Sequence, residues 1–264
     1  MEFRPCIHIH NGKVKQIVGG SLTDTENQAQ ENFVSEQDAA FFAQFYHEAG
    51  LCGGHVILLN PESSEYYEET KRQALAALGA YPGGLQVGGG ITADNAADFL
   101  EAGASHVIVT SYVFREGRIN YERLKKIKDT VGKQRLVLDL SCRKTSVGYR
   151  VVTDRWQKVT EETVDESLMN RLSQYCDEFL IHAVDVEGKA EGIEEELTAM
   201  LGNWEGCSIT YAGGVHSYGD LELLRRLGRN RVNVTIGSAL DLFGGSLAWK
   251  RVLEICGSSA GVLL

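Results

Sequence analysis

The sequence predicts an α/β protein, a single (β/α)8 TIM barrel that spans residues 1–264. Apolar segments typical of strands alternate with amphipathic helical segments along the whole chain, which favours a parallel sheet with crossover helices. Eight strand–helix pairs can be counted, and 264 residues is close to the ~250 residues typical of this barrel. Motifs that recur about half a chain apart indicate a duplicated half-barrel.

Each expected strand is a short run rich in Val, Ile or Leu, and each expected helix carries apolar residues at helical spacing. The strands are Arg4–Ile9, His55–Leu59, Leu85–Val87, His106–Val109, Leu136–Leu140, Phe179–His182, Ser208–Tyr211 and Val232–Ile236. The helices are Asp38–Ala49, Glu65–Leu78, Asn95–Ala102, Tyr121–Val131, Glu162–Cys176, Ile193–Leu201, Tyr218–Leu227 and Leu247–Ile255.

Composition excludes some classes of binding partner. A formal net charge of -10 argues against a general nucleic-acid surface, because such surfaces gather Lys and Arg against phosphates. No run of about 18 apolar residues suggests a membrane span. The first residues, Met1–Pro5, lack the apolar core of a secretory signal. We therefore expect a cytoplasmic protein with no nucleic-acid or membrane partner, and a monomer.

The six cysteines are widely spaced, and neither a CxxC pair nor a finger-like arrangement with His occurs. Several stand in apolar strand contexts. We interpret them as buried free thiols, in agreement with a reducing compartment. They are Cys6, Cys52, Cys142, Cys176, Cys207 and Cys256.

The internal repeat concerns the strand ends. Leu85–Ile91 resembles Thr210–Val215, and Val107–Ser111 resembles Val234–Ser238, in each case about half the chain away. Strands that end in glycine present bare backbone N–H groups, and these donors bind phosphate well. Two such sites on opposite sides of one barrel mouth predict a ligand with a phosphate at each end. The predicted phosphate-binding residues are Gly89, Gly90, Thr110, Ser111, Gly213, Gly214, Gly237 and Ser238. The alternative is that these glycines only form tight turns.

Two long connections are predicted to contribute to binding. The stretch Ser141–Thr163 has no strong apolar period and carries Arg143 and Trp156. Loops of this length are usually lids or binding segments, and a small hairpin within it is compatible with that role. The polar connection after the first strand contains Gly19 and Gly20, which we interpret as a hinge or another phosphate contact.

Candidate catalytic side chains lie on the first and fifth strands. His8 and His10 alternate with isoleucines, so both are expected on the barrel-interior face. Asp139 is the half-repeat counterpart of His8. Such a pair could act as general base and acid, each contributing about 10²–10⁴-fold to a proton transfer. The alternative for each of them is a structural role as a satisfied polar residue in the core.

Two further polar residues lie at the end of the sixth strand and just after it. His182 could contact the ligand or bond the neighbouring backbone, and Asp185 could bind ligand hydroxyls or cap the next helix. No third ligand stands at a telling spacing from His8 and His10, so we predict no metal site.

These motifs together carry a resemblance to a known family. The segments Cys6–Gly20, Val137–Lys144, Phe179–Ala183, Tyr211–Gly214 and Gly237–Asp241 resemble those of the ProFAR isomerases of histidine biosynthesis, especially the fungal and plant branch. The resemblance covers essentially the whole chain. It implies a (β/α)8 barrel and an Amadori rearrangement, without a cofactor, of an aminoaldose carrying two phosphates into its aminoketose.

The resemblance also implies residue roles. Asp139 would be the general acid that opens the ribose ring, the strand-one position would be the base that takes the C2 proton, and Trp156 would stack on the ligand. The family carries Asp at the strand-one position, whereas this chain has His8. Ala183 stands where many bacterial members have Thr.

The departure at His8 leaves other functions open. One is a catalytically impaired barrel that binds bisphosphate ligands. Another keeps the isomerase chemistry but takes phosphoribosyl anthranilate, the substrate of a sister barrel. The sister cyclase is disfavoured, because its pattern has Asp in strand one and it normally works with a glutaminase partner.

Overall fold

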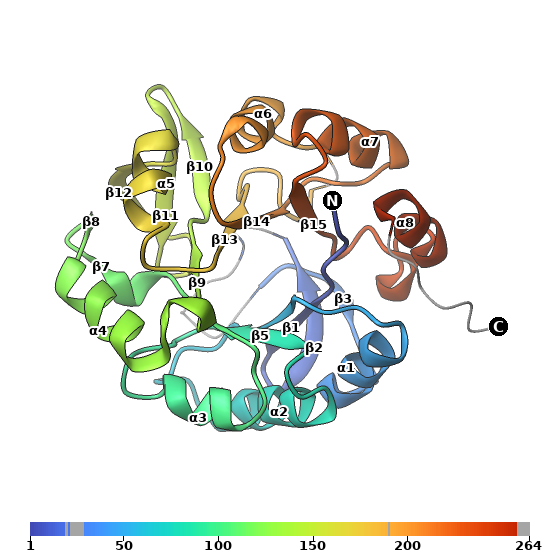
Figure 1. Ribbon diagram of the computed structural model, residues 1–264. Coiled ribbons are helices and arrows are strands. Elements are labelled where there is room, and N and C mark those ends of the chain that lie inside the picture. The colour runs from blue at the N-terminus through green and yellow to red at the C-terminus, as the bar shows by residue number, and fades with distance from the viewer. Residues whose placement is uncertain (19–20, 22–28, 190, 258–264) are drawn as a thin grey trace.

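The protein is described by a computed structural model that covers residues 1–18, 21, 29–189 and 191–257. Parallel strands form a curled sheet with helices around it (Figure 1), which confirms the predicted fold class. The parallel strands are β1 (Cys6–His10), β4 (Gly54–Leu58), β5 (Leu85–Gly88), β6 (Val107–Val109), β9 (Leu136–Asp139), β13 (Glu178–His182), β14 (Ser208–Ala212) and β15 (Val232–Thr235).

The barrel closes between the start of the chain and β15. Phe3 bridges Val234 in parallel. Arg4 N donates to Val234 O at 2.8 Å, and Val234 N donates to Glu2 O at 2.9 Å. Backbone hydrogen bonds therefore join the two ends of the sheet, as barrel closure requires.

Helices follow the barrel strands and cover the outside of the sheet (Figure 1). Several begin at a side-chain cap, such as the capping box in which Ser217 and Asp220 satisfy each other's backbone N–H groups. The helices are α1 (Ala39–Glu48), α2 (Tyr67–Ala80), α3 (Ala96–Glu101), α4 (Tyr121–Val131), α5 (Glu166–Leu172), α6 (Glu195–Asn203), α7 (Tyr218–Leu227) and α8 (Trp249–Cys256).

The strands bury apolar side chains against the helices, and they bury both polar side chains and a small apolar cluster (Ile57, Ile108, Val137 and Leu180) apart from the main core. Ile7 and Ile9 of β1 are fully buried in the main apolar core. At the amino-terminal end of the barrel, Glu178 is buried and pairs with Arg4. The Glu178 carboxylate also accepts from Gln86 Nε2 at 2.9 Å and from Thr210 Oγ1 at 2.5 Å. This network satisfies a buried charge and closes the floor of the barrel with hydrogen bonds.

The two long connections contain strands beyond the eight predicted, and a hairpin in the second connection agrees with the alternative considered for it. β2 (Lys13–Ile17) pairs antiparallel with β1, and β3 (Glu31–Val34) pairs antiparallel with β2 at the edge of the sheet. Gly19 and Gly20 lie outside the described residues. The stretch after β9 forms a separate antiparallel sheet of β10 (Cys142–Thr145), β11 (Gly148–Thr153) and β12 (Lys158–Thr163). Consequently α5 begins at Glu166, later than predicted, with Asp165 as its cap. A short hairpin of β7 (Phe114–Arg115) and β8 (Arg118–Ile119) follows β6.

All six cysteines are free, as predicted, but they are not all buried. Cys52 is exposed and Cys207 is half-buried, and both lie outside the strands and helices. In the part of the chain that the structure describes, no helix is both long enough and apolar enough to cross a bilayer.

Candidate active site

A cavity of about 230 Å³ opens at the carboxyl ends of the barrel strands. Asp139, Trp156 and the first pair of predicted phosphate-binding strand ends line it. A smaller cavity of about 30 Å³ lies at the second pair of strand ends. His8, His182 and Glu187 line both cavities, so a ligand that reached from one to the other would pass these three side chains.

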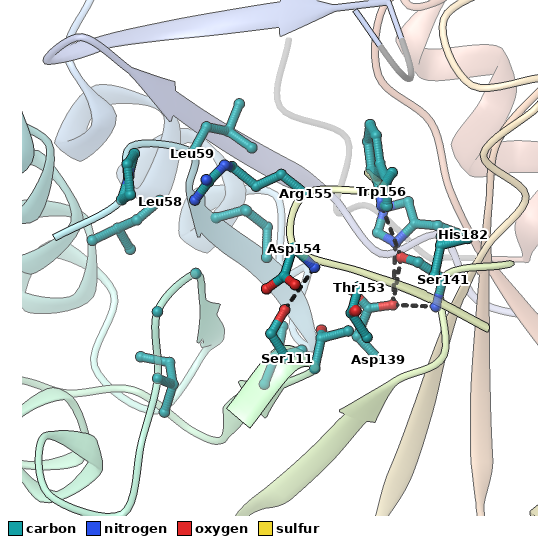
Figure 2. A pocket seen from close by; sticks show the side chains of 18 of the residues that line it. Leu58, Leu59, Ser111, Asp139, Ser141, Thr153, Asp154, Arg155, Trp156 and His182 are labelled. Carbon is teal, nitrogen blue, oxygen red and sulfur yellow. Dashed lines mark hydrogen bonds and ion pairs between the residues drawn. The ribbon is translucent and has the colours of Figure 1, made fainter. Parts of the chain in front are cut away.

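The carboxylate of Asp139 is held by the residues that follow it (Figure 2). Its Oδ1 accepts from both the backbone N and the Oγ of Ser141, each at 2.7 Å. Trp156 Nε1 in turn donates to Ser141 Oγ at 3.0 Å. Asp139 is therefore fixed at the cavity wall, and the loop that carries Trp156 is linked to it through one hydroxyl group.

His182 lies against this network. Its Nδ1 is 3.8 Å from Asp139 Oδ1, and its ring centroid is 5.9 Å from that of Trp156. Burial lowers the pKa of His182, but the carboxylate of Asp139, followed by that of Glu187, more than offsets this, so the pKa is raised. A proton on His182 is thus stabilised beside the acid that the sequence singled out.

His8 contacts a second histidine. His8 Nε2 lies 3.3 Å from Nε2 of His55 on β4, and the two rings are stacked with centroids 5.5 Å apart. Burial, and then the charge of His182, lower the pKa of His8 to about 3. The pKa of His55 is also lowered well below its usual value, again first by burial. Both imidazoles are neutral at neutral pH, so His8 has a lone pair with which to accept a proton.

The glycines of the two halves adopt matching backbone conformations. Gly89 and Gly90 have φ of 99° and 71°, and Gly213 and Gly214 have φ of 115° and 78°. A Cβ on Gly89 would lie 2.1 Å from the carbonyl oxygen of Leu58. These positions therefore need glycine, and the equivalence of the pairs supports the predicted internal repeat.

The turn between β11 and β12 reaches the cavity. Asp154, Arg155 and Trp156 are consecutive residues at positive φ, from 53° to 67°. Asp154 N donates to Ser111 Oγ at 2.8 Å, and all three residues line the larger cavity (Figure 2). Left-handed backbone is strained for such residues, and strain of this kind is common at ligand sites.

Comparisons with known proteins show the family of the chain. The family model described as "Histidine biosynthesis protein" matches residues 2–246. The chain belongs to this family.

Relatives named in the comparisons match most of the chain. A chloroplastic protein of Medicago truncatula is 53% identical over 257 residues, which covers 96% of this chain and 81% of the relative. Proteins of Yarrowia lipolytica and Neurospora crassa are each 46% identical, covering 92% of this chain and 93% of the relative. All three are named 1-(5-phosphoribosyl)-5-((5-phosphoribosylamino)methylideneamino) imidazole-4-carboxamide isomerase, which is the ProFAR isomerase. The resemblance to the plant and fungal branch of the family is thereby confirmed.

Some predicted site residues lie elsewhere. Arg143 is outside the residues that line the cavities, and its Nε pairs with Asp185 Oδ1 at 3.0 Å. Asp185 also accepts from Lys144 N at 3.0 Å, so it holds the start of the β10–β12 sheet. His10 is buried at the turn into β2, beyond the cavity wall. Burial and then the charge of Lys15 lower its pKa to about 4.

Several residues that line or support the site were missed from the sequence. Glu187 stands two residues beyond Asp185 and lines both cavities, whereas only Asp185 stood out in the sequence. Ser141 and Arg155 lie in the connection predicted to contribute to binding and line the larger cavity, but the sequence assigns neither a role of its own. His55 opens an otherwise apolar run, Val56–Leu59, and a lone polar residue at an inward position was the signal available for it.

Proposed function

We propose that the chain is a ProFAR isomerase that converts an aminoaldose bisphosphate into its aminoketose by an Amadori rearrangement in histidine biosynthesis. The observation that carries this proposal is a pair of cavities that share His8 in their walls, one lined also by Asp139 and each lined by one pair of the predicted phosphate-binding strand ends. The names of the relatives support the choice of substrate. We also propose a bisphosphate ligand, a monomeric enzyme and a cytoplasmic location, although the Medicago relative is chloroplastic by name.

The reaction needs one acid and one base. Asp139 donates a proton to the ring oxygen of the aminoaldose, so the C1–O bond breaks and a Schiff base forms between C1 and nitrogen. His8 then removes the C2 proton and leaves an enolamine. Protonation at C1 and loss of the C2 hydroxyl proton give the ketone, so no electron leaves the substrate and no co-reactant is consumed. Each proton transfer accounts for about 10²–10⁴-fold.

The phosphates are assigned to the two sets of strand ends. Backbone N–H groups at Gly89 and Gly90, with Thr110 and Ser111, would hold one phosphate. Gly213, Gly214, Gly237 and Ser238 would hold the other. Arg155 lines the larger cavity, where its guanidinium could add a charged donor to the first phosphate.

A second candidate function is a barrel that binds the bisphosphate with little turnover. The observation that favours it is His8 itself, because a pKa of about 3 makes the imidazole a weak base at neutral pH. Substrate phosphates would raise this pKa, and the size of that effect decides between the two functions.

The test is a steady-state assay with purified protein and ProFAR, following formation of the aminoketose. Turnover establishes the isomerase, whereas binding without turnover establishes the impaired barrel. Phosphoribosyl anthranilate serves as the second substrate. Equal rates with both substrates would overturn the assignment to histidine synthesis alone.

A further inference from the structure

A cysteine and two histidines, one of them the proposed base His8, meet inside the barrel. Cys6 and His8 are two residues apart on β1 and share its interior face. His55 of β4 pairs with Cys6 in the parallel ladder. The ligand atoms of the three side chains all lie within 4.8 Å of one another. Within the residues that the structure describes, this is the one such group of three potential metal ligands.

We propose that Cys6, His8 and His55 bind a thiophilic divalent metal ion, zinc in the first instance, with one coordination position open to the cavity. Spacing along the chain gave no hint of this site, because the third ligand comes from the neighbouring strand. The register of β1 and β4 brings it into place.

The separation of the two imidazole nitrogens fits zinc coordination. Two nitrogens at ~2.0–2.1 Å from a tetrahedral ion lie about 3.3–3.4 Å apart, and His8 Nε2 and His55 Nε2 are 3.3 Å apart. A thiolate on the same ion would lie about 3.6 Å from each nitrogen. Since Cys6 Sγ is within 4.8 Å of both, a shift of about 1 Å would bring it into coordination distance.

The simplest alternative is a hydrogen bond between the two neutral imidazoles. That bond would explain the nitrogen pair, and it leaves the sulfur with weak partners. The Cys6 thiol donates to Ile236 O at 3.8 Å and accepts from Gln16 Nε2 at 3.9 Å, and Thr235 is a further neighbour. A metal ion would give this buried sulfur a strong partner, and the Cys6 thiol would release one proton to solvent on binding.

The remaining coordination position faces the ligand. His8 lines both cavities, and Cys6 and Glu187 line the smaller one. Three protein ligands with one open position are typical of zinc sites that exchange a water molecule or a substrate oxygen. The Glu187 carboxyl at the same cavity would offset part of the positive charge of the ion.

Metal binding has a consequence that rests on the proposed function. The Nε2 atom of His8 cannot hold zinc and accept the C2 proton at the same time. Zinc should therefore inhibit the isomerase, and a chelator should restore its rate.

The test begins with the full chain stripped of metal by a chelator and titrated with Zn²⁺ alone or Co²⁺ alone. We expect one equivalent of Zn²⁺ by calorimetry, one proton released, and a thiolate-to-cobalt charge-transfer band with Co²⁺. Cys6→Ser should lose the band. Both Cys6→Ser and His55→Asn should weaken binding by more than the ~10–100-fold that loss of an outer-shell partner costs. The matched control is Cys142→Ser, a buried thiol outside the group, which should keep both band and affinity.

Absence of stoichiometric binding to the parental chain would overturn the proposal. Unchanged affinity for zinc in both Cys6→Ser and His55→Asn would also overturn it. Circular dichroism of each variant checks that the variant is folded. The metal site and the isomerase function can be contradicted independently. If the chain binds metal but has no isomerase activity, only the proposed function is wrong. If it turns over substrate, binds no metal and is insensitive to zinc, only the metal site is wrong.

Discussion

The Nδ1 atom of His182 lies 3.8 Å from Oδ1 of Asp139, the same oxygen that accepts two hydrogen bonds of 2.7 Å from Ser141. One carboxylate oxygen is thus held by a serine on its own strand end and faced by a histidine from β13. The arrangement fixes the direction of the carboxyl group and leaves it at the cavity wall, where a general acid must stand.

Asp139→Asn should abolish turnover and leave substrate binding within a few fold. The amide keeps the shape of the side chain and can still accept from Ser141, but it has no acidic proton to give. Single-turnover assays together with substrate titration would measure the two effects. Asp94→Asn is the control, because Asp94 is an exposed carboxylate that pairs with Lys126. A near-parental kcat in Asp139→Asn would show that another group opens the ring.

Trp156→Phe should lower kcat/KM by up to about 10-fold. The substitution keeps an aromatic ring but removes the N–H that reaches Ser141 Oγ at 3.0 Å, and a typical hydrogen bond contributes about 0.5–1.5 kcal/mol. Trp204→Phe is the matched control, since Trp204 Nε1 donates to Asn170 Oδ1 at 2.7 Å on the outer side of the barrel. Kinetics and thermal unfolding of both variants would separate the roles. Equal kinetic loss in the control would contradict a specific function of Trp156.

Most of the barrel strands and helices could be predicted from the sequence, because the residue patterns that mark them are local. Glycine after apolar strands marked the turns at Gly89 and Gly213, and the repeat between halves placed Asp139 opposite β1. The sequence did not predict which residues of neighbouring strands are paired with each other. The contact of His8 with His55 depends on the pairing of β1 with β4, and side-chain periodicity within one strand carries no information about its neighbour. Asp185 and Glu187 show a related limit, since turn geometry decided which of the two faces the cavity.

Gly89→Ala should destabilise the barrel and weaken binding at the first phosphate position. The new Cβ would stand 2.1 Å from Leu58 O, so the backbone would have to move. The φ of 99° would add a backbone strain of about 1–3 kcal/mol for any residue other than glycine. Gly50→Ala is the control: its φ is 68°, and the added Cβ would meet nothing within 4 Å. Urea unfolding and KM would be compared. A larger KM effect from Gly50→Ala than from Gly89→Ala would count against the phosphate assignment.

His8→Asp should raise kcat by about 10²-fold, the lower end of the range for a positioned acid or base. Burial disfavours the charged form of any side chain, so it shifts the pKa of a histidine and the pKa of an aspartate in opposite directions. It lowers the pKa of His8 to about 3 and so weakens the imidazole as a base. It would raise the pKa of an aspartate at the same place and so strengthen the carboxylate. The substitution also ends the contact between His8 and His55 at 3.3 Å, which otherwise engages the nitrogen that must accept the proton.

The measurement is steady-state turnover in the presence of a chelator, so that bound metal cannot mask the comparison. His8→Asn is the control, since the amide has a similar size to aspartate but cannot accept a proton at neutral pH. We expect it to fall below the parental rate. Parental activity in His8→Asn would show that His8 is not the base, whatever His8→Asp does. An unchanged rate in His8→Asp together with loss in His8→Asn would instead mean that the substrate phosphates restore the basicity of the imidazole, and that histidine serves this position as well as aspartate.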